Sequence, residues 1–225
     1  NNIKKTILEN ENSMSLIHIF NSQFLLDDNV TDNLPIGLHG NLYTHQLTFF
    51  LVPKNDIKNI KLVFSKSNIS LDKIILKNFV EGTELISNEN NDSFVKIKIL
   101  SETSHISYFK NSCLVYVQNF NFGFNILLRD VSKVCSLSLD NVKEIFSNLN
   151  FDEISTLNQN EYLDKKYFKD ELFRKINLSN IKDIVEARIK ELINLMYEKN
   201  INFRSFKNNK NLIYLSIENS NISLE

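Results

Sequence analysis

The sequence predicts an α/β protein built in two parts. Segments rich in β-branched and aromatic residues, such as 43–52 (YTHQLTFFLV), are typical of strands. Residues 181–196 carry apolar side chains mostly at steps of three and four, which is typical of an amphipathic helix. The chain has 225 residues, 42% of them hydrophobic. Because domains usually contain about 100–200 residues, we expect two domains or subdomains.

Composition excludes several classes of partner and site. The formal net charge is −1, from 26 basic and 27 acidic residues, so no overall field attracts nucleic acid or an anionic membrane at long range. Cys113 and Cys135 have no ligand at metal-binding spacing, so we expect neither a disulfide framework nor a metal site. The longest apolar runs, such as 113–117, are far shorter than the roughly 20 residues of a transmembrane helix.

Glycine is scarce in a way that bears on function. The chain has only four Gly and two Pro, which is below the average usage of about 7% and 5%. Phosphate-binding loops are built from glycine because their backbone N–H groups must approach the ligand closely. The chain begins with Asn1 rather than Met and shows no signal-peptide pattern, so we interpret it as a piece of a longer protein.

The first 77 residues predict strands around a glycine- and proline-containing loop, followed by a short helix behind Pro53. β-branched and aromatic residues indicate the strands, and apolar residues at helical spacing indicate the helix. In chain order we expect strand 15–20, loop 33–40 (NLPIGLHG), strand 43–52, helix 56–65 and strand 73–76.

Residues 78–225 predict hairpin-like strands, then helices, then a closing strand. Ser179 is expected to cap the helix of residues 181–196. Residues 151–178 have no clear period and are interpreted as a reduced subdomain or a connection. The remaining expected elements are strands 95–100 and 113–117 on either side of 104–109, helices 125–135 and 139–149, and strand 212–217.

Several segments together resemble FtsA, a family of actin-like bacterial cell-division proteins. The segments SLIHIFNSQFLLDD, NLPIGLHG and LYTHQLTFFLV are similar to a small inserted subdomain that contacts other proteins in that family. The segments SLDNVKEIF and NIKDIVEARIKELINL are similar to two of its later helices. The resemblance implies an actin-like (ribonuclease H-like) fold fragment, with an inserted α+β subdomain of SHS2 type at residues 1–77 and the ATPase-type domain at 78–225.

The family's phosphate hairpin reads Asp-x-Gly-Gly-Gly-Thr, and this chain departs from it. Aligning Thr103 with the family threonine places Lys98 at the magnesium-holding aspartate and His105 at a second aspartate. The glycine positions hold Leu100, Ser101 and Glu102. A lysine cannot hold a cation, and a glutamate repels phosphate.

Three further nucleotide contacts of the family are altered. A Gly-Gly pair before a phosphate-facing helix becomes Gly123-Phe124-Asn125, where a helix-entry glycine is the simpler interpretation. The ribose-contacting Glu and Lys become Lys143 and Phe146, and the glycine pair behind the adenine becomes Ile217-Glu218 after Ser216. We therefore predict that ATP and magnesium are not bound and that the protein is not an enzyme.

Two groups of residues are candidates for partner contacts. Phe120, Phe122 and Phe124 alternate, so an extended backbone would place three rings on one face. Glu186 and Arg188 are contact candidates by family analogy, although a solvated, ion-paired helix face is the simpler interpretation.

The resemblance implies a scaffold of the division machinery that binds FtsZ, other copies of itself and later division proteins. It implies a location in the cytoplasm or at the inner face of the cell membrane, with membrane contact only through a segment outside this chain. One alternative is a PilM-like adaptor of a pilus or secretion system, which binds a peptide in its cleft. Another is an intact actin-like ATPase whose motifs are aligned differently.

Overall fold

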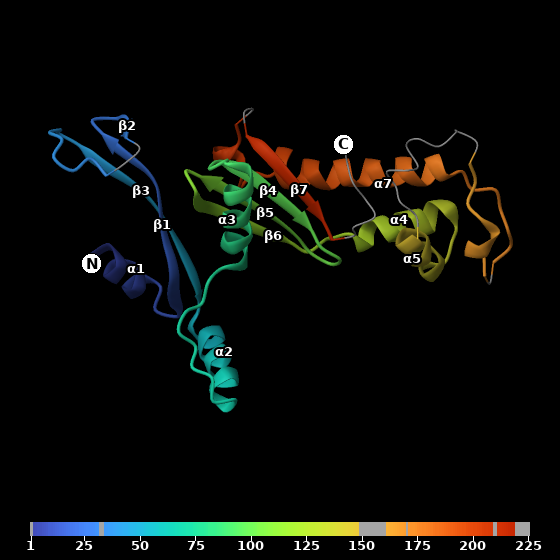
Figure 1. The fold of residues 1–225 in the computed structure, drawn as a ribbon, viewed down its shortest axis with the longest axis horizontal. Coiled ribbons are helices and arrows are strands. Elements are labelled where there is room, and N and C mark those ends of the chain that lie inside the picture. Colours follow the sequence, from blue (N-terminus) through green and yellow to red (C-terminus); the bar gives the residue numbers. More distant parts are fainter. Residues whose placement is uncertain (1, 32–33, 149–160, 170, 209–210, 219–225) are drawn as a thin grey trace. The chain divides into compact units, whose positions relative to one another are not determined.

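The chain folds into two compact units (Figure 1). The structure, a computed structural model, describes residues 2–31, 34–148, 161–169, 171–208 and 211–218. One unit contains residues 1–94 and 107–117, and the other contains 95–106 and 118–225. The boundary that the sequence indicated after residue 77 lies inside the first unit.

The first unit contains a three-stranded antiparallel sheet of order β2-β1-β3, formed by β1 (Met14–Leu26), β2 (Asn29–Thr31) and β3 (Tyr43–Pro53). The two strands expected here are confirmed, but β1 continues well beyond residue 20. Its register with β3 shifts twice, between Leu16 and His18 and between Asn21 and Gln23. Such bulges bend a strand locally and allow one long strand to follow a curved path.

Three helices belong to this unit: α1 (Asn2–Asn10), α2 (Lys54–Lys66) and α3 (Lys77–Glu89). The expected helix 56–65 is confirmed as α2. The expected strand 73–76 is wrong, because residues 71–76 have no regular structure and lead into α3. The sequence analysis did not predict α1 or α3.

Gly82 explains why α3 is difficult to recognise from the sequence. Glycine inside a helix lowers helix propensity by about 1 kcal/mol relative to alanine. A Cβ atom at Gly82 would collide with the ring of Phe109, which stacks on Phe94 with 4.9 Å between ring centroids. Close packing against an aromatic ring therefore requires the glycine that makes the helix pattern weak.

The second sheet has four strands in the order β6-β5-β4-β7. They are β4 (Phe94–Ile99), β5 (Ser104–Lys110), β6 (Cys113–Phe120) and β7 (Leu212–Ile217). Buried Val95, Ile97 and Ile99 alternate along β4 with the half-buried Lys96 and Lys98. This alternation aims Lys98 away from the fully buried side of the strand.

The helical part of the second unit contains α4 (Asn125–Cys135), α5 (Leu139–Asn148) and α7 (Leu178–Ile193), which continues as a π-helical turn at Asn194–Glu198. Helix α4 packs against both α5 and α7 (Figure 1). The interior is apolar, and its fully buried side chains include Leu127, Val131, Val142, Ile145, Ile181 and Ile189. The expected helices 125–135 and 139–149 are confirmed within a residue.

The start of α7 differs from the expectation. The cap is Asn177 rather than Ser179, because the Asn177 side-chain oxygen accepts the Ser179 N–H at 2.9 Å. Within the predicted reduced subdomain 151–178, residues 151–160 lie outside the described part of the chain. The described remainder includes a short 3₁₀ turn, Lys165–Tyr167, and a β-bridge between Tyr162 and Asn177.

Candidate functional site

The turn between β4 and β5 contains the residues that the resemblance aligns with the family's phosphate hairpin. Leu100 donates its backbone N–H to the Thr103 carbonyl at 2.9 Å, which closes the turn. Ser101 and Glu102 therefore lie at its tip, and both are exposed. Lys98 and His105, on the flanking strands, are half-buried.

The entry to α4 is bonded directly to this turn. Phe124 donates its backbone N–H to the Leu100 carbonyl at 2.7 Å, and Asn125 donates to the Ser101 carbonyl at 2.9 Å. A Cβ atom on Gly123 would collide with the carbonyl oxygens of Leu100 and Ser101. Gly123 therefore allows the chain to approach its own turn.

Glu218, just after β7, completes the cluster. One of its carboxylate oxygens accepts the Ser101 backbone N–H at 2.5 Å and the Ser101 hydroxyl at 2.6 Å. The Glu218 backbone N–H donates to the Ile99 carbonyl at 2.9 Å. The sequence analysis expected side chains here to fill an adenine space, whereas this carboxylate contacts the turn.

In this arrangement, the backbone N–H donors around the turn are already hydrogen-bonded within the protein. A phosphate site requires N–H groups that point at the ligand. The N–H groups of Ser101, Phe124 and Asn125 bind a carboxylate and two carbonyls of the chain instead. Glu102 adds a second carboxylate beside them and accepts a hydrogen bond from the Asn125 side chain. A phosphate would have to displace these acceptors and overcome repulsion by both glutamates.

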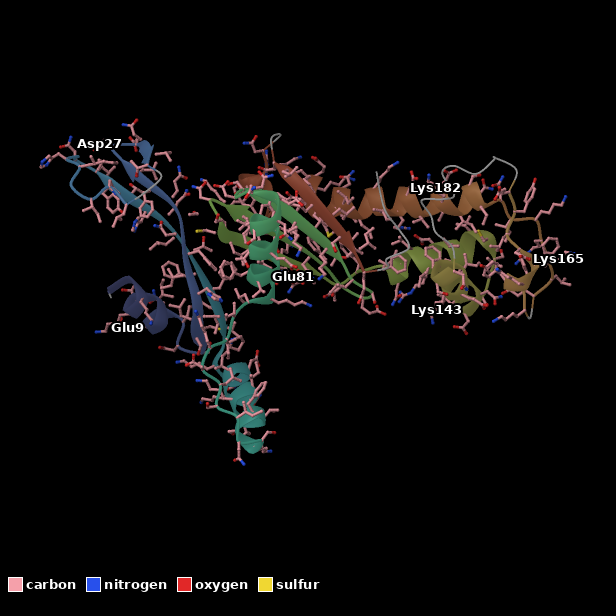
Figure 2. All side chains as sticks on the ribbon, in the orientation of Figure 1. Glu9, Asp27, Glu81, Lys143, Lys165 and Lys182 are labelled. Carbon is pink, nitrogen blue, oxygen red and sulfur yellow. The ribbon has the colours of Figure 1, made fainter. Side chains whose placement is uncertain are left out.

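Lys143 and Phe146, the two residues of α5 that align with the family's ribose contacts, differ in burial. Phe146 is 1% exposed, and its ring meets that of Phe124 edge-to-face with 5.6 Å between centroids. Lys143 is exposed to solvent (Figure 2) and lies 3.4 Å from the Asp140 carboxylate. The structure therefore brings Phe124 and Phe146 together in the core and directs Lys143 away from it.

The predicted aromatic patch is only partly accessible. Strand β6 ends at Phe120, so the backbone is not extended through all three aromatic positions. Phe124 is 6% exposed and belongs to the core. Phe120 and Phe122 are half-buried, with 5.2 Å between their ring centroids. Only these two remain candidates for contact with a partner.

Glu186 and Arg188 are both ion-paired on α7. Glu186 lies 3.5 Å from Lys182 and 3.3 Å from Lys190. Arg188 is paired with Asp130 of α4 and, at 2.6 Å, with Glu191. A groove of 370 Å³ opens beside this pair, lined by Asp130, Lys133, Val134, Ile184, Ala187, Arg188 and Glu191. Sequence spacing gave no signal for the Asp130 contact, because the partners are 58 positions apart.

A second internal carboxylate, also missed from the sequence, binds the start of α5. Glu171 accepts the Ser138 backbone N–H at 2.6 Å and the Asn141 side-chain N–H at 2.8 Å. The Ser138 hydrogen bond, and then those to the side chains of Ser138 and Asn141 and the charge of Arg174, hold the Glu171 pKa below its ordinary value, against a smaller opposing effect of desolvation. Another potential anion site at a helix N-terminus is therefore filled by the chain's own acid.

Among the described residues, no cluster of three or more His, Cys, Asp and Glu side chains could hold a metal ion. No helix in the described ranges has the length and apolar character required to cross a membrane.

The chain is similar to known proteins at low sequence identity. No family model matches it. The cell-division protein FtsA of Buchnera aphidicola is 20% identical over 189 residues, which are 84% of this chain and 45% of that protein. The PilM–PilN type IV pilus biogenesis complex matches with a TM-score of 0.55 and 10% identity, over 97% of this chain and 56% of the other. MreB5 of Spiroplasma citri bound to AMPPNP matches over 76% of this chain with a TM-score of 0.48 and 13% identity.

The chain spans about half the length of these relatives. The PilM match covers nearly all of the chain and identifies the fold. The chain has an actin-like fold.

Proposed function

We propose that this chain belongs to a non-enzymatic, actin-like scaffold of bacterial cell division, which acts as FtsA does through contacts with FtsZ and other division proteins, and which works without ATP. The match to FtsA over 84% of the chain supports the division role. The two hydrogen bonds that Ser101 donates to the Glu218 carboxylate support the absence of ATP binding.

Both the geometry and the charge around the β4–β5 turn support the absence of nucleotide binding. ATP brings several negative charges and requires backbone donors and a metal-holding acid around its phosphates. Lys98, on β4, stands at the position aligned with the metal-holding acid, and the Ser101 N–H of the turn donates to the Glu218 carboxylate. Phe124 stands where the family has its second glycine, and its backbone N–H is bound to the Leu100 carbonyl. This N–H is therefore not free to bind a phosphate.

Calorimetry with Mg-ATP tests this part of the proposal. We expect no binding heat at millimolar ATP from protein whose circular dichroism shows it folded. Micromolar binding that depends on magnesium would overturn the proposal and favour an intact actin-like ATPase.

The partner is tested separately, by co-sedimentation of the chain with FtsZ polymers from the same organism. We expect the chain to pellet with FtsZ in the presence of GTP and to stay in the supernatant without FtsZ. A Phe120→Ser, Phe122→Ser variant tests whether the half-buried rings contribute, and Tyr162→Ser, on a 47% exposed ring, is a control. No co-pelleting of the wild-type chain would contradict the FtsZ assignment and leave the nucleotide question open.

A PilM-like adaptor is the second candidate, favoured by one observation: the match to the PilM–PilN complex covers 97% of the chain with a TM-score of 0.55. Under this alternative the chain would bind a PilN-like protein and not FtsZ. Pull-down of the chain with each of the two proteins in parallel separates these functions.

A further inference from the structure

Helix α2 leaves its apolar side uncovered. None of its residues is buried, and its main contacts with other elements are those with β1 and β3. Ile60 is 41% exposed, Val63 66% and Phe64 41%. A helix of a globular protein normally buries such a side against a core. Its exposure here indicates a surface that another component covers.

The lysines of α2 lie outside its apolar side, where Leu62 lies among them, while Asp56 is placed with the apolar residues. At about 100° per residue, Ile57, Ile60, Val63 and Phe64 share one side. Lys61 lies beside Ile57 at one edge of this side, and Lys66 follows Val63 at the other. With four lysines and one aspartate, α2 carries a net charge of +3 in a chain whose total is −1.

The helix has little stabilisation of its own. Pro53 precedes it and provides no side-chain hydrogen bond to its first turn. Helices of 13 residues are marginal in water without packing. Contact with an apolar, anionic surface would stabilise α2 through both of its sides.

From these observations we propose that α2 binds an anionic lipid surface, with its apolar side in the headgroup region and its lysines against the lipid phosphates. Apolar residues bordered by basic ones at both edges are typical of interfacial helices, whose lysine stems extend along the apolar boundary while the ammonium groups reach the headgroups. Ile69, three residues after the helix, is a further exposed apolar residue, at 52%. Because the net charge of the chain is −1, the chain as a whole is not attracted to an anionic surface. The lysines of α2 attract it only at short range, within a Debye length of about 10 Å at 0.1 M salt.

This lipid contact differs from the one implied by the family resemblance, because it uses a segment inside this chain. The alternative partner for α2 is an acidic groove on another protein. Lysines at both edges of the apolar side favour lipid, since headgroups surround an inserted helix on every side.

Vesicle sedimentation tests the charge. We expect the whole chain to pellet with vesicles of phosphatidylglycerol and phosphatidylcholine, and not with phosphatidylcholine alone. The variant Lys58→Glu, Lys61→Glu should weaken binding by more than about 25-fold, because each lysine near an anionic surface contributes about fivefold. The variant Lys165→Glu, Lys166→Glu makes the same charge change at exposed residues of the second unit and should bind as wild type.

Fluorescence tests the apolar side. The chain has no tryptophan, so Phe64→Trp introduces a single reporter. Its emission should shift to shorter wavelength when anionic vesicles are added. Leu195→Trp, at a residue 40% exposed compared with 41% for Phe64, should not shift.

The proposal is overturned if the chain does not bind anionic vesicles, if the Lys58 and Lys61 reversal has no effect, or if the Phe64→Trp emission is unchanged by vesicles. Loss of FtsZ binding in the reversal variant without vesicle binding would assign α2 to a protein partner instead.

Discussion

The carboxylate of Glu218 accepts both the backbone N–H and the hydroxyl of Ser101, across 117 positions of the sequence. The contact joins the end of β7 to the β4–β5 turn. It places an acid of the chain at a backbone donor that the resemblance would assign to a phosphate.

Removing this acid should free the turn without unfolding the protein. We expect Glu218→Ala to speed hydrogen exchange at the Ser101 amide by several-fold. Because both residues are exposed, the free energy of unfolding should change by less than about 1 kcal/mol. Exchange measured by NMR checks this, with Glu84→Ala, at an exposed residue of α3, as the control. An unchanged Ser101 exchange rate would contradict the hydrogen bond.

Gly123 should tolerate no side chain. The Cβ atom of Gly123→Ala would meet the backbone of Leu100 and Ser101, which cannot move without breaking the bonds to Phe124 and Asn125. We expect a loss of about 1–3 kcal/mol in the free energy of unfolding, as for other overpacked sites. Urea denaturation measures it, and the exposed neighbour Asn121→Ala should change little. Equal stability of the two variants would show that the turn and the entry to α4 are not in close contact.

We expect the contribution of Glu171 to stability to depend on pH in the acid range. Its pKa is lowered, chiefly by the Ser138 backbone hydrogen bond, so its contribution to stability is complete above the ordinary pKa of 4.5 and is lost as pH falls through the lower folded value. We expect Glu171→Gln to be less stable than wild type at neutral pH and to approach it in acid. Thermal unfolding across this pH range measures the difference, and a constant gap would contradict the assignment.

We expect a second pH dependence of stability from His18, in the first unit. Burial and then the charge of Lys73 lower its pKa, and its neutral Nε2 accepts the Leu76 N–H at 3.2 Å before α3. This contribution is complete above the ordinary pKa of 6.5 and is lost as pH falls through the lower folded value. NMR titration of the imidazole and of the Leu76 amide should give the same midpoint. A His18→Phe variant should remove the titration of the Leu76 amide.

The sequence predicted the elements whose patterns are regular. Helix α4 and strand β7 have the predicted bounds, and the apolar period of α7 was clear. Helix α3 was missed because Gly82 serves contact with Phe109, whose proximity depends on the tertiary fold. The predicted strand 73–76 failed for the same kind of reason: its apolar residues do not pair with a neighbouring strand.

The residue types at the candidate site could be predicted from the sequence, but the contacts between them could not. Substitution of the glycine positions by Ser101 and Glu102 was visible in the sequence. The bond from Ser101 to Glu218 was not, since it joins segments separated by most of the second unit. The same holds for Glu171 and Ser138, where the acid that binds the start of α5 comes from 33 positions away.

Hydrogen exchange of three amides tests the central proposal most directly. The N–H groups of Ser101, Phe124 and Asn125 are all bonded within the chain, so adding millimolar Mg-ATP should leave their exchange rates and chemical shifts unchanged. Protection of these amides by Mg-ATP, with release of Glu218 from Ser101, would contradict the account and identify a working phosphate site.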